Sequence, residues 1–532
     1  MTTSPPVPVT EAHRADGILT RIARDDWGDF SPSVYETARV HAWAPDLPGH
    51  RIRTEWLLKE QSADGLWGEG PTPYRLLPTL SVVDAFLRAL TRHAPSLTDD
   101  DAIRLTRATD AALTALATMP SRGTLPDTAA VELLVPLLLA DVNKTLDEIA
   151  ARSPTTVRLT AAHRRLGVIH SVAPADERIF RKLAALPALP MKLHHCFEAL
   201  APHCPPPPPP PTTGGHALIG ASPAATAAWL TVSPTPGGAR AALAATGERY
   251  GHLFPEAAPL AAFERLWVLA ALLRPGLVAP TDPVARRLVR PLLLRGGVSG
   301  APGLAPDADD TALAVHVATV LGLGPDPGVL TPFASDGHFA CYIGEDTGSV
   351  SANAHVLTAL WDTMPDPGSH PAVRATANWL TRQQHPEGHW TDKWHASPLY
   401  ATSRVCRALA RSHAPDHRSA LGRAGRWTRN RQRPDGSWGV WQSTLEETAY
   451  GVQILRTTGP QDAAPALRRA LRWIAEHRTN QAPHPPRWHD KTLYAPATVI
   501  DAETTAAVAE GGVHAEALGS SSRGVKDGRP RS

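Results

Sequence analysis

The sequence predicts an all-α protein built from stacked helical hairpins. An acid-Gly-x-aromatic turn recurs at Asp64, Asp336, Glu387 and Asp435, and the last three copies are 51 and 48 residues apart. An apolar segment follows each turn, while the 53 prolines and 39 glycines gather between such segments. This punctuation is typical of medium-length helices joined by tight turns. A repeat near 50 residues with two helices per copy indicates either an open solenoid or a closed αα-barrel.

The apolar segments are the expected inner helices of these hairpins. In chain order they cover residues 77–90, 222–230, 349–360 and 400–409, and a last one starts near Glu446. In each turn the glycine is expected to adopt the left-handed corner, because it has no Cβ to clash. The aromatic ring that follows is expected to pack between neighbouring hairpins.

Four stretches depart from this pattern. Residues 1–15 and 511–532 are polar or rich in Pro, Gly and Ser, so we expect a disordered N-terminus and a disordered tail. The run of prolines at 205–211 predicts an exposed loop in polyproline II conformation. Residues 275–306, also rich in Pro and Gly, are interpreted as a passage between two helical domains.

Composition excludes several classes of protein. The 53 basic and 51 acidic residues give a net charge of +2, which argues against a nucleic-acid partner. No stretch approaches the roughly 20 apolar residues of a membrane span, and the N-terminus lacks the apolar core of a secretory signal. The four cysteines are scattered without a CxxC pair, as in a reducing compartment. We therefore expect a soluble cytoplasmic protein without stable membrane insertion.

Three acids, Asp307, Asp309 and Asp310, crowd directly before an apolar run. Asp and Thr in this position are helix-start signals, so a capping cluster is the simplest interpretation. Like charges this close cannot all ionise in an apolar setting, so one pKa should rise and leave a proton donor near neutral pH. The segment aligns with Glu446-Glu447-Thr448-Ala449 of the last repeat, which predicts that the acids open an inner helix.

Several motifs in order resemble the class II terpene cyclases of the bacterial labdane-type diterpene synthase group. Asp307-Ala308-Asp309-Asp310-Thr311-Ala312 matches the DxDD-T-A signature of that family. Residues 31–38 resemble its S-x-Y-D-T-A segment, with Glu36 for Asp and Arg39 where Trp is usual. Other matching segments are 56–68, 222–227, 263–267, 392–394 and 491–496, so the resemblance covers most of residues 27–500.

The resemblance implies two αα-barrel domains, β and γ, with the active site between them. The β domain is expected at 16–45 plus 275–510, and the inserted γ domain at 46–274. A class I α domain is not expected, because Asp99-Asp100-Asp101 lacks the distal acid of a DDxxD motif and is interpreted as a helix cap.

The implied activity is protonation-initiated cyclisation of geranylgeranyl diphosphate, with the diphosphate retained. Asp309 would donate the proton, while Asp307 and Asp310 polarise and orient it. The expected product is a bicyclic labdane-type diphosphate, with ent-copalyl diphosphate the first choice. Other labdane, halimane or clerodane products stay open, as does a drimane skeleton made from farnesyl diphosphate.

Further roles follow from the resemblance. Aromatic faces would stabilise cations, with Trp267, Tyr342, Trp394 and Phe339 as candidates. Lys393, Arg75 and Lys491 are candidate partners of the diphosphate. Glu132 matches a family glutamate near a Mg2+ site, and its place in an apolar run predicts a buried acid. His195 aligns with the family's catalytic histidine and Glu256 with its asparagine partner, so the two are expected to form the terminating base.

Other interpretations stay open at this point. A zinc-dependent prenyltransferase β-subunit would use Cys341 with Asp336 and His338, at a spacing that matches no usual zinc pattern. A hopene-type cyclase shares DxDD but has more repeats, and a non-catalytic scaffold would use the proline run as a hook. For a diterpene cyclase the partners are the prenyl diphosphate and a separate class I synthase that takes the product; a homodimer is left open.

Overall fold

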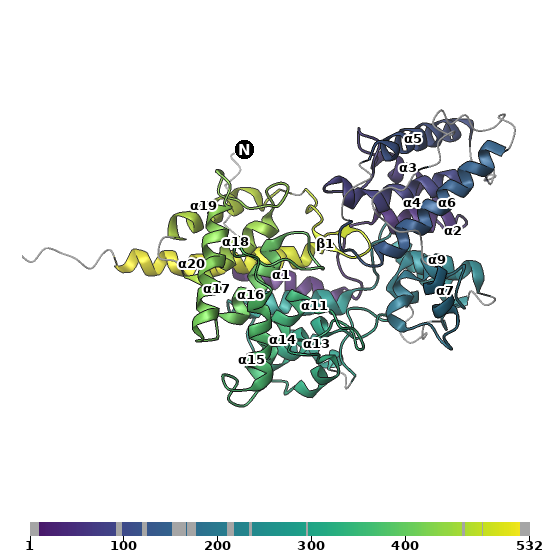
Figure 1. Cartoon of the computed structure of the whole chain (residues 1–532). Helices are drawn as coiled ribbons and strands as arrows, with labels where there is room; N and C mark the ends of the chain where they lie inside the picture. Colours follow the sequence, from purple (N-terminus) through teal and green to yellow (C-terminus); the bar gives the residue numbers. More distant parts are fainter. Residues whose placement is uncertain are drawn as a thin grey trace, which may run out of the picture.

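The computed structural model describes residues 10–91, 98–119, 125–151, 166, 177–209, 218–233, 237–293, 296–459, 463–480 and 482–521. Within these ranges the regular structure is helical apart from one hairpin, in which β1 (Trp488–His489) pairs antiparallel with β2 (Leu493–Tyr494). The helices form two lobes, and the hairpin lies where they meet (Figure 1).

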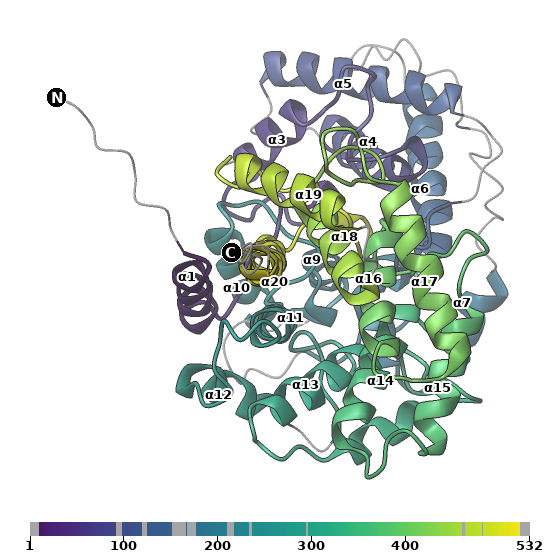
Figure 2. The ribbon, with the colours of Figure 1, turned by 90° about the vertical axis from the view of Figure 1, so that its left-hand side faces the viewer.

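The first lobe is a closed αα-barrel. Its inner helices, each packed on the next, are α11 (Ala261–Leu273), α13 (Ala308–Val320), α14 (Val350–Thr363), α16 (Pro398–Leu409), α18 (Leu445–Thr458) and α20 (Ala497–Ser521). Outer elements cover the seams: α1 (Glu11–Arg24), α12 (Pro283–Val289), η4 (Pro327–Phe333), α15 (Pro371–Arg382), α17 (Pro415–Asn430) and α19 (Ala464–His477). Because α20 packs against α11 and closes the ring, the repeat builds a barrel and not a solenoid; Figure 2 shows α20 end-on.

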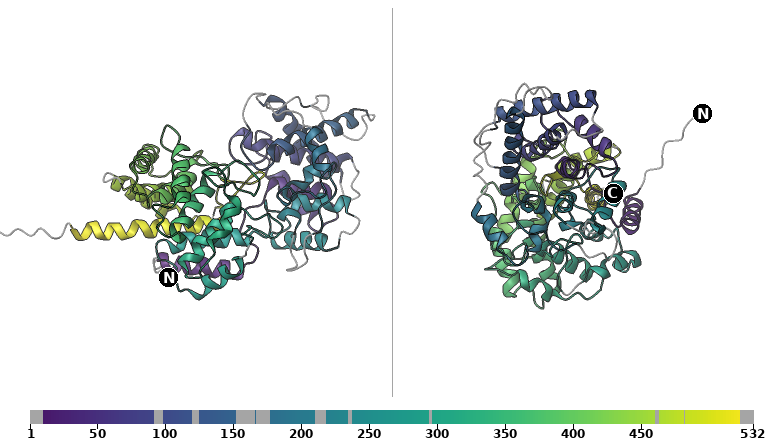
Figure 3. Two further views of the ribbon diagram at one scale, coloured as in Figure 1. Left: turned by 60° about the horizontal axis from the view of Figure 1, so that its bottom comes forward. Right: turned by 90° about the vertical axis from the view of Figure 1, so that its right-hand side faces the viewer.

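The second lobe repeats this plan with fewer helices. Its inner ring is α2 (Val34–Trp43), α4 (Thr72–Thr91), α6 (Val131–Ala151), α8 (Phe197–Leu200) and α9 (Pro223–Val232), and it closes where α9 meets α2. Around it lie α3 (His50–Lys59), α5 (Asp99–Thr118), α7 (Glu177–Ala184) and α10 (Gly237–Arg249), with the short turns η1 (Met191–Cys196) and η2 (Ile219–Ala221). The two lobes lie side by side in the left view of Figure 3.

The recurring turn has the same construction wherever the repeat is complete. Gln384 Nε2 donates to the carbonyl of Gly388 at 2.8 Å and to that of Ala420 on the next outer helix at 2.9 Å. The Trp390 ring is fully buried, and its Nε1 donates to the Leu380 carbonyl at 2.7 Å. The expected packing of aromatic rings between hairpins is confirmed.

Two helices lie on the other side of the domain boundary expected from the sequence. Tyr35 and Ala38 of α2 belong to the core of the second lobe, whereas the apolar residues of α11 belong to the core of the first. The first lobe therefore comprises 10–32 and the chain from about 260, and α12 within 275–306 is one of its outer helices. Both α2 and α11 are almost entirely buried, so their sequences do not show which lobe they face.

The ends of the chain are more ordered than expected. Helix α1 begins at Glu11, where Thr10 caps it and Arg478 pairs with Glu11 at 2.6 Å, so 11–15 are helical. Helix α20 continues to Ser521, ten residues past the expected start of the tail at 511. Residues 1–9 and 522–532 lie outside the described residues.

The proline run is also partly packed. The Pro207 carbonyl accepts a hydrogen bond from Trp229 Nε1 at 2.9 Å, and Pro207 is buried. The expectation of a wholly exposed loop is therefore wrong at this position, while Pro210 and Pro211 lie outside the described residues. None of the described helices has the length and hydropathy to cross a bilayer.

Candidate active site

The acidic triplet opens an inner helix of the first lobe, as the repeat register predicts. Asp307 is the N-cap of α13 and accepts a hydrogen bond from the Asp310 amide at 2.8 Å. Asp309 lies in the first turn, and its Oδ1 is 2.5 Å from Nδ1 of His355 on α14. The Asp309 and His355 side chains are only 14% and 8% exposed. One acid therefore caps the helix while the next is held by an imidazole in a nearly closed site.

Burial raises the pKa of two of the three acids, and the neighbouring carboxyls add to this effect. Burial raises the pKa of Asp307 to about 7. Burial and the neighbouring Asp307 raise the pKa of Asp310 well above its ordinary value. Asp310 Oδ1 is buried without a hydrogen-bond partner, as expected for an acid that is not ionised. These raised pKa values agree with the sequence-based expectation of a protonated carboxyl in this cluster.

An aromatic cluster lies beside the Asp309–His355 pair. The Trp267 ring meets the His355 ring edge-on at 5.6 Å between centroids. Trp267 Nε1 donates to the Tyr400 hydroxyl at 3.3 Å, and the Tyr400 ring lies 4.8 Å from that of Trp488. Trp267 is thus close to the acid, as expected. His355, Tyr400 and Trp488 were not anticipated, because in the sequence a ring within an apolar segment is indistinguishable from ordinary core.

The loop residues predicted to bind substrate lie near the start of α14. Asp392 accepts from the Ser349 hydroxyl at 2.7 Å and from the Val350 amide at 2.8 Å, which ties the loop to that helix. Lys393 follows, with Nζ 5.0 Å from the centre of the Trp394 ring. Phe339 is instead a buried core residue whose amide donates to Asn353 Oδ1 at 2.8 Å.

Tyr342 connects the acidic triplet with the boundary between the lobes. Burial raises its pKa most, followed by Asp307, Cys341 and Asp310, and then by Asp490 of the hairpin. Tyr342 is therefore within electrostatic range of both the triplet and the hairpin.

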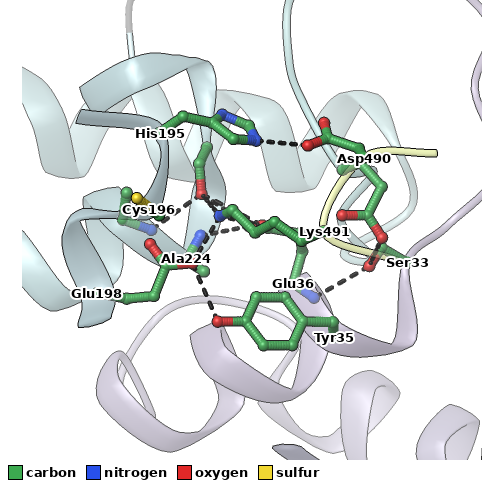
Figure 4. A network of polar contacts seen from close by, with 12 residues as sticks. Ser33, Tyr35, Glu36, His195, Cys196, Glu198, Ala224, Asp490 and Lys491 are labelled. Atoms are coloured by element: carbon green, nitrogen blue, oxygen red, sulfur yellow. Dashed lines mark hydrogen bonds and ion pairs between the residues drawn. The ribbon is translucent and has the colours of Figure 1, made fainter. Parts of the chain in front are cut away.

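A buried polar network crosses that boundary (Figure 4). Lys491, at the tip of the hairpin, reaches into the second lobe, where Nζ is 2.7 Å from Glu36 Oε1 and 2.6 Å from Glu198 Oε1. Its third partner is the Ser222 hydroxyl at 2.7 Å. Burial alone would lower the pKa of Lys491, but Glu198 and Glu36 raise it. With two carboxylates already bound, this ammonium is not a free partner for a diphosphate, contrary to expectation.

His195 belongs to the same network but not to the expected pair. Its Nε2 is 2.9 Å from Asp490 Oδ1, and its Nδ1 is 2.7 Å from the Gly220 carbonyl oxygen. Both partners are acceptors, so both ring nitrogens carry protons. Burial opposes this state, but Asp490 raises the pKa of His195. Asp490 had no signal in the sequence, because it is 295 positions from its partner.

Glu256 has different partners. Its Oε1 accepts from the Ser33 hydroxyl at 2.7 Å and from the Thr492 hydroxyl. Its Oε2 is buried without a hydrogen-bond partner. Burial, and then Asp490, raise its pKa to about 8. His195 and Glu256 are thus linked through the hairpin and do not contact each other directly.

Two further candidates lie outside this cluster. Glu132, in the first turn of α6, is exposed, so the expectation of a buried acid is wrong. A single exposed carboxylate still suits Mg2+ carried by a diphosphate, because Mg2+ uses one or two carboxylates together with phosphate oxygens. Arg75 forms two hydrogen bonds with Asp64 at 2.7 and 2.8 Å, so it stabilises the first repeat turn.

The zinc alternative has no support among the described residues. Cys341 is buried, while the His338 ring nitrogens lie near the carbonyls of Asp336 and Asp346 at 3.1 and 3.2 Å. The one potential ligand group found in the described ranges does not include these residues. A zinc-dependent prenyltransferase centre is therefore not formed here.

Two large cavities that open to the surface lie away from the acidic triplet. A cavity of about 940 Å3 is lined by α3 and α5, with Trp56 and Arg104 among its residues. Another of about 630 Å3 lies between α1, α20 and the loop before β1. Neither contains a residue of the triplet, so the site is recognised by its buried acids and aromatic rings and not by an open hollow.

Comparison with known proteins identifies the family of this chain. Residues 332–450 match the squalene-hopene cyclase C-terminal domain. Over 511 residues the chain is 48% identical to labda-7,13-dienyl diphosphate synthase from Streptomyces clavuligerus, covering 94% of this chain and 93% of the relative. The protein belongs to the class II terpene cyclases of the labdane-type diterpene synthase family. A second member, copalyl diphosphate synthase from Streptomyces cyslabdanicus, is 45% identical over 92% of this chain and 94% of its own.

Solved structures agree with this assignment. The ent-copalyl diphosphate synthase from Streptomyces platensis is 39% identical, with a TM-score of 0.85 over 94% of this cyclase and 99% of that chain. The Arabidopsis thaliana ent-copalyl diphosphate synthase, at 17% identity and a TM-score of 0.60, shares the fold over 93% of this chain and 63% of its own. The two lobes are thus the β and γ αα-barrels of a class II cyclase.

Proposed function

We propose that the protein cyclises geranylgeranyl diphosphate to a bicyclic labdane-type diphosphate. The Asp309 carboxyl transfers its proton to the terminal carbon–carbon double bond, and the next two double bonds attack the resulting cation in turn, closing two rings. A proton is then lost from a carbon beside the last cation. The diphosphate stays attached, so substrate and product are isomers. The observation that supports this proposal is the Asp309–His355 pair within a largely buried acidic triplet.

The surroundings of Asp309 favour the release of its proton. With its Oδ1 hydrogen-bonded to His355, Oδ2 is the oxygen that holds the transferable proton. Once the proton is gone, the His355 N–H stabilises the carboxylate left behind. The raised pKa values of Asp307 and Asp310 reduce the negative charge that would oppose the new carboxylate.

Lys393 is the proposed partner of the diphosphate at the barrel mouth, because no carboxylate forms an ion pair with it among the described residues. Glu132 would bind a Mg2+ that accompanies the diphosphate. When bound, this ion neutralises phosphate charge. Trp267, Trp394 and Tyr342 would offer ring faces to the developing cations.

The proposed termination step uses the network around the hairpin. Because His195 already carries two protons in this arrangement, it acts as the cationic partner of Asp490 and not as the base. Asp490 is then the proposed acceptor for the last proton, because the pKa lowered by His195 keeps this carboxylate ionised. Glu256, whose pKa is about 8, changes the net charge beside Asp490 when it gains or loses a proton. Loss of the acceptor should let water capture the final cation and yield a hydroxylated product.

The test is incubation of purified protein with geranylgeranyl diphosphate and Mg2+, dephosphorylation, and product analysis by gas chromatography–mass spectrometry. Wild type should yield a bicyclic alcohol, with ent-copalol the first standard to compare. Asp309→Asn should lower kcat by at least about a hundredfold. Asp99→Asn is the matched control, because this acid lies in the first turn of α5, in the other lobe. Full activity of Asp309→Asn, or no bicyclic product from wild type, would contradict the proposal.

Parallel incubations separate the alternatives. Farnesyl diphosphate giving the better kcat/KM would favour a drimane-type cyclase, and conversion of squalene a hopene-type one. No turnover of any substrate would favour the scaffold. The alcohol obtained after dephosphorylation also tests whether the diphosphate was retained, as a product destined for a separate class I synthase requires.

A further inference from the structure

The repeat turn before α16 differs chemically from its two complete counterparts. All three turns use the same hydrogen bonds from a glutamine side chain to the turn glycine and to the next outer helix. The positions on either side of the acid are Ser62 and Leu66 in the first copy and Arg433 and Ser437 in the last. In the middle copy both are histidines, His385 and His389, around Glu387.

The backbone of this turn is rigidly defined. The His385 amide donates to the His389 carbonyl at 2.8 Å, and the Gly388 amide donates to the His385 carbonyl at 2.8 Å. Gly388 has a φ of +109°, and a Cβ there would lie 2.8 Å from the Arg423 carbonyl oxygen. These restraints bring the two imidazole rings to 4.5 Å between centroids.

Each side chain offers a ligand atom, and these atoms lie within 4.8 Å of one another. A tetrahedral zinc ion with bonds near 2.05 Å needs ligands about 3.3 Å apart, which rotation of the exposed His385 and Glu387 side chains can supply. Glu387 is now paired with Arg431 at 2.9 Å, but both side chains are more than half exposed, at 53% and 60%. Such a surface pair costs little to exchange.

The His389 ring is held in place, and one of its nitrogens has no partner. Its ring stacks on Trp427 at 4.7 Å between centroids, which restricts the ring orientation. Its Nδ1 is buried and has no hydrogen-bond partner. A buried polar atom without a partner is rare in proteins and needs an explanation.

We propose that His385, Glu387 and His389 bind one Zn2+ ion, with water as the fourth ligand. Two imidazoles and a carboxylate are a usual zinc ligand set, whereas Mg2+ prefers oxygen ligands alone. The ion would close the turn from which the chain runs directly to the loop of Lys393 and Trp394. This site is separate from the diphosphate-associated Mg2+ considered above, and it does not depend on the proposed cyclase activity.

The test is a calorimetric titration of the full-length protein with Zn2+ in excess Mg2+, after a chelator has removed bound metal. Wild type should bind one Zn2+ ion. The substitutions His389→Ala and Glu387→Gln should each lower the affinity for this ion at least about tenfold. His413→Ala, which removes another exposed histidine of the same lobe, should leave that affinity unchanged. Thermal unfolding without metal checks that each variant is folded, and Glu387→Gln changes only an exposed side chain.

Cobalt provides a second readout, because Co2+ in a tetrahedral site absorbs visible light far more strongly than hexa-aqua Co2+. Wild type should show this absorption and His389→Ala should lose it. Equal Zn2+ affinity in wild type and His389→Ala, or displacement of Zn2+ by millimolar Mg2+, would show an adventitious ion only and overturn the proposal.

Discussion

At the scale of single residues, His355 decides what Asp309 can do. The pair resembles a second contact between the same two helices, where His316 Nδ1 lies 2.6 Å from Asp362 Oδ2. Only the first pair includes an acid of the DxDD motif. Proximity of an imidazole to a carboxylate therefore does not by itself define the site. The Asp309–His355 pair defines it because this pair lies beside the triplet and the aromatic cluster.

His355→Ala should lower kcat about a hundredfold, because the carboxylate formed after proton transfer loses its hydrogen bond. His316→Ala is the matched control and should keep kcat within a few-fold of wild type. Equal losses in the two variants would show that His355 is only structural.

Glu256 should make the stability of the protein depend on pH. Its pKa is raised from 4.5 to about 8 in the folded state, so between these values the folded state holds a proton that the unfolded state has released. Stability therefore falls as pH rises through this window, by at most about 1.4 kcal/mol per pH unit from this group. Glu256→Gln should flatten that part of the slope in urea unfolding measured at pH 5, 6, 7 and 8. An unchanged slope would show that Glu256 is already ionised in the folded protein.

At the scale of elements, Lys491 forms one of the contacts through which the β1–β2 hairpin joins the two lobes. Lys491→Met should lower the free energy of unfolding by about 3–5 kcal/mol, because Glu36 and Glu198 are left buried beside each other without a cation. Adding Glu198→Gln should recover part of this loss in urea unfolding. Arg240→Met, which removes an exposed partner of Asp46, should cost less than about 1 kcal/mol. Similar losses for Lys491→Met and Arg240→Met would contradict the buried role.

The repeat turns give a second element-scale test. Gly436 has a φ of +97°, and a Cβ would lie 2.8 Å from the Arg469 carbonyl oxygen. Gly436→Ala should therefore destabilise the protein by about 1–3 kcal/mol from strain, with the clash in addition. Gly459 has a φ of +58° and open space around it, so Gly459→Ala should cost only about 1 kcal/mol. Thermal unfolding of the two variants measures the difference. Equal decreases in unfolding temperature would show that the backbone of the turn adjusts to the added Cβ.

At the scale of the whole molecule, the first lobe depends on residues from the far N-terminus. Ile22 of α1 is fully buried against the barrel, although it precedes the whole second lobe in the sequence. Ile22→Ala should cost about 2–5 kcal/mol in urea unfolding. Ile52→Ala, at a site 47% exposed, should stay within about 0.5 kcal/mol. If Ile22→Ala is neutral, α1 is not part of the folded barrel.

The sequence predicted the helical class, the repeat and the place of the acids, because glycine turns and apolar periods are local signals. Ring closure depends on contact between α11 and α20, which no local pattern contains. The same limit applies to the site. DxDD is contiguous, whereas the partners of Asp309 and His195 come from other elements and lie 46 and 295 positions away. Lys491 and Glu132 were misjudged because burial and ion pairing cannot be read from residue type.

Lys491 and Glu36 stand 455 positions apart, which has a consequence for the order of biosynthesis. Glu36 and Glu198 leave the ribosome long before the lysine that neutralises them. Domains begin to fold during translation, at a rate of about 5–20 residues per second. In the N-terminal lobe, Glu36 and Glu198 therefore lack their lysine partner until almost the entire polypeptide has been made. The last step in the folding of this lobe follows translation.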